Sequence, residues 1–322
     1  MLPLPVAAFA QGKREAVRIQ DYPGTANMPF RVAKAKGFCE AHGLICELQV
    51  IASGPLGAQA LLARSIDVGF FPPEVQINAM IKGAELRAIA NGVQRNILVV
   101  VIRNDIEAPN ADKGFPAFMA DLKGKKIGVP ARASGVELNF ILLAQSAGLK
   151  AENFTFVATG APNTAYGALV TKQVDANATF EPSGVMCEVL QTCKLVYRAS
   201  EATQPVEIVG TNGAGANFVV TKAMLDQKPD VVEALIAAAK DADAFIQDPE
   251  NFDELLKIAE SFFKFDMARG DEIMAAQLKR AIPGYKAAIS RSAFRTIADN
   301  MLSTQQISIP FDTSKAIYDK AP

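Results

Sequence analysis

Hydrophobic positions along the chain follow two alternating patterns, which are short apolar runs and longer segments with an apolar residue every three or four positions. Short β-branched runs predict strands, and the periodic segments predict amphipathic helices. The first third of the chain predicts strands at 17–20, 46–51, 67–71, 86–90 and 97–102, separated by helices at 30–42, 57–64 and 74–82. Strands and helices that alternate in this way are typical of α/β proteins with mostly parallel sheets.

Two segments of the chain resemble each other. ALLARSIDVGFFPPE, which starts at Ala60, aligns without gaps with ALVTKQVDANATFEP, which starts at Ala168, and this alignment places Asp67 opposite Asp175. Upstream of each segment a helix ends in Gly-Leu before a strand. This internal similarity predicts two α/β lobes built on one plan.

The pattern changes after Lys228, where four amphipathic helical segments follow one another, each beginning near Asp, Asn or Ser. We expect these helices to pack on the first lobe, which would make that lobe discontinuous. The predicted division is lobe 1 from 15–104 and 212–322, lobe 2 from 116–205, and hinge crossovers at 105–115 and 206–211.

The stretch LKGKKIGVPARASGVELNF, residues 122–140, combines a short strand, a loop and the start of a helix. Ser134 and Glu137 have the spacing of a capping box, and Arg132 lies in the loop before them. Free backbone N–H groups, the positive end of a helix and an arginine together predict an anion site. The alternative is that Ser134 and Glu137 satisfy this helix end themselves and that Arg132 is solvated.

Composition indicates a globular protein of about two domains, because half of the 322 residues are hydrophobic and 21% are charged. The formal net charge of −1 argues against a nucleic-acid partner. Residues 1–10 are apolar and end in Ala8-Phe9-Ala10, the form of a signal-peptidase site. They predict the remnant of an export signal and therefore a periplasmic location, with an ordinary disordered terminus as the alternative.

The four cysteines fall into two local pairs, Cys39 with Cys46 and Cys187 with Cys193. Each pair could close a short disulfide loop, as an oxidising compartment allows, whereas four buried thiols are the alternative. Neither pair has the C-x-x-C spacing of a zinc ribbon or a thioredoxin motif, so no metal site is expected.

Ligands of open α/β sheets bind beyond the carboxyl ends of the strands. The polar and aromatic residues at these predicted strand ends are the candidate site residues, and they should face a cleft between the lobes. They are Tyr22, Thr25, Asn27, Ser53, Gly54, Phe71, Glu74, Arg132, Ser134, Gly135, Thr159, Phe180 and Glu181.

An ordered set of motifs carries a family resemblance: VAKAKGFCEAHGL, then SG, ALLARSIDVGFF, DLKGKKIGVP and ALVTKQVDANATFEP. In this order they resemble the periplasmic substrate-binding proteins of nitrate, sulfonate and taurine importers, a family that also includes pyrimidine-precursor binders. The resemblance spans roughly residues 17–220. It implies an α/β, two-lobed periplasmic binding protein fold (type II) with a helical C-terminal tail. It also implies a monomer that closes on a small molecule and delivers it to an ABC permease.

The resemblance places ligand-contacting loops at 22–27, 53–54, 71–72, 132–135 and 180–181. The chain departs from the family because it has no Trp, where the family often has one near Phe180. The predicted ligand is a sulfonate or carboxylate held by Arg132, with an aromatic or aliphatic body against Tyr22, Phe71 and Phe180. If Glu181 points inward, an amine-bearing pyrimidine, such as a thiamine precursor, becomes the alternative.

Enzyme activity is not expected, and neither is a cofactor. The single histidine, His42, is predicted at the surface at the end of a helix, and no H-E-x-x-H, G-x-S-x-G or P-loop motif occurs. A pyrimidine-precursor synthase of similar fold is the enzymatic alternative, but its site histidine and cysteine-rich signature are not visible. The effector domain of a transcription regulator would need a DNA-binding motif, for which the N-terminus has no room.

Overall fold

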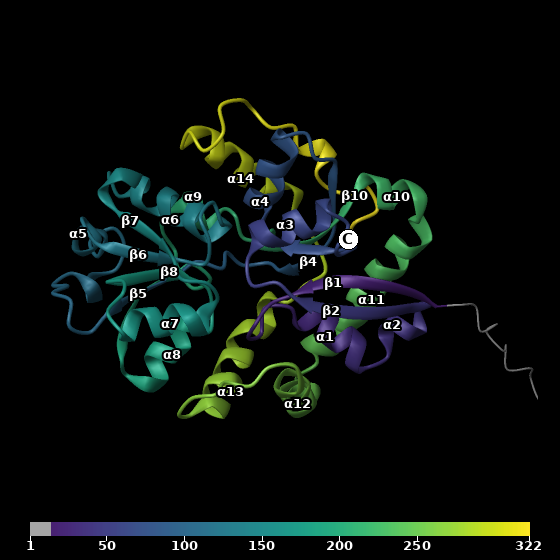
Figure 1. The fold of residues 1–322 in the computed structure, drawn as a ribbon, viewed down its shortest axis with the longest axis horizontal. Helices are drawn as coiled ribbons and strands as arrows, with labels where there is room; N and C mark the ends of the chain where they lie inside the picture. Colours follow the sequence, from purple (N-terminus) through teal and green to yellow (C-terminus); the bar gives the residue numbers. More distant parts are fainter. Residues whose placement is uncertain (1–13) are drawn as a thin grey trace, which may run out of the picture.

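A computed structural model describes residues 14–322. One lobe has a five-stranded β-sheet, and the other has a two-stranded and a three-stranded sheet that a single bridge joins, which we describe together as the first sheet. Helices flank the strands of both lobes (Figure 1). The predicted export remnant at 1–10 lies outside the described residues. Within residues 14–322, none of the helices combines the length and the apolar character that crossing a bilayer requires.

The first sheet combines parallel and antiparallel strands. β1 pairs in parallel with β2, and a parallel bridge from Ile19 to Val68 places β1 beside β3. β10 returns from the distant part of the chain and runs antiparallel to β3 and β4. The strands are β1 (Glu15–Asp21), β2 (Leu44–Val50), β3 (Gly69–Phe71), β4 (Leu86–Val93) and β10 (Ala216–Thr221).

The second sheet has the strand order β7-β6-β8-β5-β9. β6 is parallel to β7 and β8, whereas β5 is antiparallel to β8 and β9. Both sheets are therefore mixed, because each holds a strand of reversed direction next to its parallel strands. The strands are β5 (Val99–Arg103), β6 (Lys126–Val129), β7 (Thr155–Ala158), β8 (Ala176–Thr179) and β9 (Cys193–Arg198).

The expected assignment of 97–102 to the first lobe is wrong. β5 pairs along its length with β8 and β9 of the second sheet, so the chain has already crossed over at 94–98 and not at 105–115. Val99 to Ile102 are fully buried on both faces of the sheet. A continuous apolar run of this kind predicts a buried strand but carries no information about which sheet it joins. The chain returns between β9 and β10, at 199–215, which includes the expected crossover at 206–211.

Helices cover both faces of each sheet (Figure 1). On the first sheet, α1 packs with α11 and α12, while α14 packs with α4. α13 contacts α12 and also α8 of the second lobe, so the C-terminal tail reaches both lobes. The helices of the N-terminal half are α1 (Met28–Ala35), α2 (Phe38–Ala41), α3 (Gly54–Leu62), α4 (Pro73–Ile81), α5 (Met119–Leu122) and α6 (Gly135–Ser146). Those of the remainder are α7 (Pro162–Val170), α8 (Ser183–Leu190), α9 (Val206–Val209), α10 (Lys222–Gln227), α11 (Pro229–Gln247), α12 (Phe252–Phe262), α13 (Gly270–Ala281) and α14 (Arg291–Ser303).

The internal sequence similarity corresponds to repeated local structure. Arg64 and the aligned Lys172 both have left-handed backbone conformations, with φ values of 59° and 65°. Asp67 accepts a hydrogen bond from the backbone N–H of Arg18 at 2.8 Å, and the aligned Asp175 accepts one from that of Lys126 at 2.9 Å. In each lobe the aligned aspartate, which directly precedes one strand, therefore connects that strand to the neighbouring strand.

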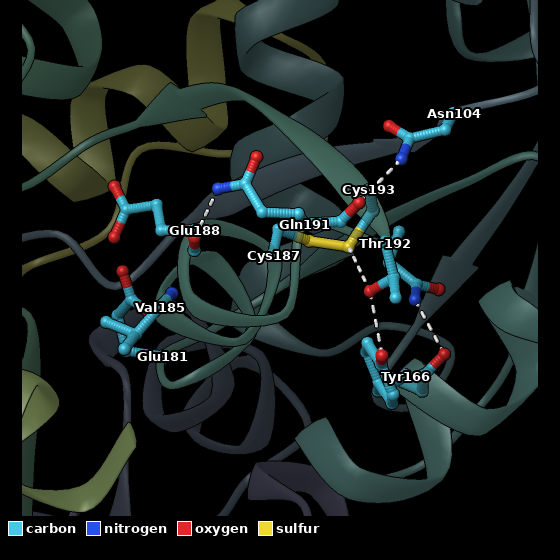
Figure 2. Close-up of a disulfide and its surroundings, with 11 residues drawn as sticks. Asn104, Tyr166, Glu181, Val185, Cys187, Glu188, Gln191, Thr192 and Cys193 are labelled. Carbon is cyan, nitrogen blue, oxygen red and sulfur yellow. Dashed lines mark hydrogen bonds between the residues drawn. A yellow bond between two sulfur atoms is a disulfide. The ribbon is translucent and has the colours of Figure 1, made fainter. Parts of the chain in front are cut away.

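Both predicted disulfides are confirmed. Cys39 is bonded to Cys46, which joins α2 to β2, and Cys187 is bonded to Cys193, which joins α8 to β9. Figure 2 shows the second bond at the end of α8. Both bonds close short loops, so each connects a helix to the strand that follows it.

Candidate functional site

A cleft lies where the carboxyl ends of β1, β3, β6 and β8 meet. We call it the main chamber, and it holds about 490 Å³ of space free of protein atoms, including its open mouth. Within residues 14–322, none of the residues that line it has a charged side chain. They are Tyr22, Ala26, Ser53, Gly54, Phe70, Phe71, Pro72, Val93, Ile97, Pro130, Ser134, Gly135, Val136, Phe180 and Ala216.

The first lobe brings the N-terminus of α3 to the main chamber. Ser53 occupies the N-cap position, but its side chain makes no capping hydrogen bond. Its hydroxyl oxygen is buried without a partner among the described residues, and the residue is only 4% exposed. The N–H of Gly54, the first residue of α3, also donates to no other group in residues 14–322. This helix end therefore leaves two polar groups without protein partners in the wall of the chamber.

The second lobe brings the N-terminus of α6 to the same chamber, but here the chain satisfies part of the helix end. The Ser134 hydroxyl accepts from the N–H of Glu137 at 3.3 Å, and the buried Glu137 carboxylate accepts from the N–H of Ala133 at 2.5 Å. The N–H groups of Gly135 and Val136 donate to no partner in the part of the chain that the structure describes. Both residues line the chamber, so two backbone donors without protein partners lie in its wall.

Arg132 does not reach the cleft, so the expected role for its guanidinium is corrected. Its side chain is 64% exposed, its Nε donates to Glu137 at 2.8 Å, and its guanidinium lies 5.5 Å from the Phe156 ring centre. The buried carboxylate of Glu137 holds the arginine, and Arg132 lines neither this chamber nor the one beside it. The alternative from the sequence, a helix end satisfied by Ser134 and Glu137 together, describes this loop better.

Thr159 and Asn27 also lie outside the cleft. Thr159 donates from its hydroxyl to the carbonyl of Val129 at 3.3 Å. Asn27 is fully buried, where its side chain accepts from the N–H of Phe30 and donates to the carbonyl of Gln20 at 2.9 Å. Its amide thus caps α1 and has no free group to offer a ligand.

Aromatic side chains form the wall of the main chamber. Tyr22 makes edge contacts with Phe70 at 5.8 Å and with Phe180 at 6.0 Å between ring centres. Phe180 follows β8, so the contact between Tyr22 and Phe180 joins the two lobes across the cleft. Burial raises the pKa of the Tyr22 phenol above its usual value, so this group stays protonated and can donate a hydrogen bond.

A second chamber adjoins the main one and holds about 620 Å³ of free space, including its mouth. The two chambers share Ala26, Val93, Ile97 and Phe180 in their walls. Thr25 and Glu181, both predicted from sequence, line this second chamber. Its complete lining is Thr25, Ala26, Val93, Arg95, Asn96, Ile97, Val99, Phe180, Glu181, Ser200, Gln277, Arg280, Ala281, Gly284 and Tyr285.

Glu181 is already paired within the protein. Its carboxylate accepts from the Nε of Arg198 at 2.5 Å and from the N–H of Val185 at 3.2 Å. Figure 2 shows Glu181 beside Val185 at the start of α8. A ligand amine would therefore have to compete with a buried arginine for this carboxylate.

A buried polar network crosses between the lobes behind the main chamber. Asn139 on α6 donates to the carboxylate of Glu74 on α4, and its carbonyl accepts from Asn96 at 2.6 Å. Asn96 also donates to Thr211 at 3.0 Å, and these two residues lie in the two crossovers. Burial raises the pKa of the Glu74 carboxyl to about 7. The network links both lobes and both crossovers, and Glu74, at its end in the first lobe, is its one titratable group.

Sequence reasoning found no site residue in the C-terminal tail, although Gln277, Arg280 and Tyr285 line the second chamber. The sequence feature that could have identified a site residue in the tail is Gln277 itself. It lies on the buried face of α13 together with Ile273 and Met274, where a polar residue is unexpected.

The described residues show no group of acidic, histidine or cysteine side chains that could hold a metal ion. His42 lies at the end of α2, as predicted, and its Nε2 is 2.7 Å from the Asp241 carboxylate on the surface. It lines neither chamber.

Two α/β lobes with a cleft at their strand ends define a periplasmic binding protein fold. A model of the NMT1/THI5-like family matches residues 25–252. A candidate binding protein of Brucella abortus is 30% identical over 251 residues, which cover 78% of this chain and 71% of that relative. The chain therefore belongs to the NMT1/THI5-like family.

Solved structures of similar fold cover nearly the whole chain. A Bordetella bronchiseptica protein is 25% identical with a TM-score of 0.78, and the match covers 96% of each chain. The alkanesulfonate-binding protein SsuA of Xanthomonas axonopodis pv. citri, bound to MOPS, is 17% identical with a TM-score of 0.73. That match covers 95% of this chain and 99% of the Xanthomonas chain.

Proposed function

We propose that this protein is the solute-binding component of an ABC importer and that it captures an organic sulfonate or carboxylate in the main chamber. The observation that carries the proposal is the convergence of two helix N-termini on one uncharged chamber. Gly54, Gly135 and Val136 offer backbone N–H groups there, and Ser53 adds an unpartnered hydroxyl.

An anion buried in an apolar site is stable only when hydrogen bonds replace its hydration shell. The N-termini of α3 and α6 supply donors from opposite lobes, and their helix dipoles favour negative charge. No lysine or arginine among the described residues lines this chamber, so a singly charged head group fits better than a doubly charged one.

The aromatic wall favours an organic ligand over a bare inorganic anion. Tyr22, Phe71 and Phe180 surround the space beyond the two helix ends and would contact an apolar body. The name of the Xanthomonas neighbour, an alkanesulfonate-binding protein bound to MOPS, is in line with this chemistry.

The proposal extends to the protein's surroundings. The family match and the fold favour a periplasmic solute-binding role beside a membrane permease. A monomeric state and the absence of catalytic activity and of nucleic-acid binding are parts of the proposal that follow from the sequence predictions alone. The two crossovers at 94–98 and 199–215 would act as the hinge when the lobes open to admit and release the ligand.

The pyrimidine alternative has less support than the anion. It needs a free carboxylate to accept from the ligand amine, and the carboxylate of Glu181 is held by Arg198 and Val185. The synthase-like alternative needs a histidine in the site, and His42 lies on the surface.

The test uses protein that has been unfolded and refolded to remove any ligand carried from the host. Thermal shift and calorimetry would then compare benzenesulfonate, benzoate, butanesulfonate, nitrate and an aminopyrimidine, because a ligand of the native state raises the unfolding midpoint. We expect a clear shift with the sulfonates or carboxylates. A shift with the aminopyrimidine alone would overturn the anion proposal, and a change in the small-angle scattering radius on binding would support lobe closure.

A further inference from the structure

The second chamber contains a buried amide that the protein does not use. Gln277 on α13 is 4% exposed, lines this chamber and takes part in no side-chain hydrogen bond with the residues that the structure describes. A buried amide that lacks partners is destabilising, so native proteins almost always provide them. The missing partner of Gln277 therefore points to something that enters the chamber.

Other glutamines show that this situation is specific to Gln277. Gln76 and Gln306 also have a buried oxygen without a partner in residues 14–322, but their Nε2 atoms donate to the carbonyls of Ala316 and Leu138. Gln247 donates to two carbonyls near the end of α13. These three amides donate hydrogen bonds to carbonyls of the fold, whereas the Gln277 amide donates none within residues 14–322.

The remaining long polar side chains of the second chamber are engaged elsewhere. Asn96 donates to Asn139 and Thr211, and the Tyr285 hydroxyl donates to the carbonyl of Thr25. Arg280 forms ion pairs with Glu188 at 2.8 Å and with Glu201 at 3.0 Å. Arg280 is thus neutralised, whereas Arg95 donates to the carbonyl of Ser200 at 2.6 Å and has no ion-pair partner in residues 14–322. Gln277 is the uncharged long side chain left to recognise a ligand.

The position of the second chamber indicates which part of a ligand would reach it. The main and second chambers share Ala26, Val93, Ile97 and Phe180, so they are neighbouring compartments of one cleft. An anion held at α3 and α6 could extend past Phe180 toward α13.

We propose that the ligand carries, at its end remote from the anionic head, an uncharged group with both a hydrogen-bond donor and an acceptor, and that Gln277 recognises it. A primary carboxamide is the simplest such group. The proposal rests on the function proposed above, and it narrows the substrate class to bifunctional organic anions. Gln277 would act as a specificity-determining residue, since a site built to hydrogen-bond a polar group rejects its apolar isostere.

The experiment compares matched probes that differ only at the remote end. The pairs are 4-carbamoylbenzoate with 4-isopropylbenzoate, 4-carbamoylbenzenesulfonate with 4-isopropylbenzenesulfonate, and adipamate with 6-methylheptanoate. Dissociation constants are measured by calorimetry for the wild type, for Gln277→Met, which keeps the side-chain volume, and for Gln247→Met. Gln247→Met is the control because it removes a half-buried amide that has partners in the fold.

We expect the ratio of carbamoyl to isopropyl affinity to fall about tenfold from the wild type to Gln277→Met, with the isopropyl probes binding as before. Gln277→Met should melt at or above the wild-type temperature, because it removes an unpartnered polar group, whereas Gln247→Met should melt lower with an unchanged ratio. If the anions bind but the ratio is the same in Gln277→Met, this inference is wrong and the proposed function stands. If no carboxylate or sulfonate binds to the folded wild type, both are wrong.

Discussion

Two helix ends with the same local sequence face the main chamber and behave differently. Ser53-Gly54 begins α3 in the first lobe, and Ser134-Gly135 begins α6 in the second. The Ser134 hydroxyl caps its own helix, whereas the Ser53 hydroxyl is buried without a partner in the described chain. Three residues further on, α6 has Glu137, whose carboxylate also accepts from the N–H of Ala133, whereas α3 has Leu56.

Ser53 and Ser134 occupy matching positions, but the hydroxyl of only one of them is used by the fold. A capped helix end stabilises the fold whether or not a ligand is present, because its hydrogen bonds lie within the lobe. An uncapped end that faces a cleft leaves polar groups without partners until a ligand arrives. Ser53 is therefore expected to act mainly in binding and Ser134 mainly in stability.

The largest effect should come from the network behind the α6 end. The pKa of Glu74 is raised by burial to about 7, so the folded protein binds this proton more tightly than the unfolded chain does. Its contribution to stability is fully present below the unfolded pKa and is lost as the pH rises through about 7, by up to about 3 kcal/mol. The melting temperature should fall between pH 5 and pH 8. Glu74→Gln should reduce that fall, and an equal fall in the variant would contradict the role of Glu74.

The next effect concerns the glycines that follow the two serines. A Cβ on Gly135 would lie 2.8 Å from the Cβ of Pro72 in the other lobe, so Gly135→Ala should hinder closure and weaken binding roughly 10- to 100-fold. A Cβ on Gly54 would instead meet Val75 and Phe71 of its own lobe, at 3.1 and 3.2 Å. Gly54→Ala should thus lower the melting temperature. Calorimetry and thermal denaturation of both variants test this, and equal changes in both quantities would contradict it.

Substitution of each serine by alanine should produce opposite results in the two variants. Ser53→Ala is expected to weaken binding of an organic anion about tenfold and to leave the melting temperature unchanged or raised. Ser134→Ala should lower the free energy of unfolding by about 1 kcal/mol through loss of the cap, with a smaller change in affinity. Urea denaturation and calorimetry measure the two quantities. A loss of stability in Ser53→Ala without a loss of affinity would remove Ser53 from the site.

The smallest effect is expected at Arg132, which the sequence alone predicted to be the main group that binds the anion. Its side chain is exposed and pairs with Glu137 outside the cleft, so Arg132→Ala should change affinity less than about threefold and stability by at most about 1 kcal/mol. Titration of the best ligand against this variant is sufficient. A large loss of affinity would mean that the loop rearranges on binding.

Much of the cleft could be predicted from sequence because the ends of strands locate it. Tyr22, Ser53, Gly54, Phe71, Ser134, Gly135 and Phe180 all line the main chamber, and Thr25 and Glu181 line the second. Asn27, Arg132 and Thr159 follow strands as well, but they bond to nearby chain instead. Residue position after a strand is a local property, whereas the direction and partner of a side chain depend on what packs around it.

By itself, the sequence determined the features that arise within a few residues of chain. These are the α/β alternation, the repeated aspartates, the capped start of α6 and the two disulfides, each of which joins neighbouring elements. Only the tertiary structure decided which sheet receives β5, that α13 brings Gln277 to the cleft, and that Glu74 meets Asn139 across the lobes. Those contacts join residues far apart in the chain, and the burial that shifts the pKa of Glu74 exists only once both lobes are assembled.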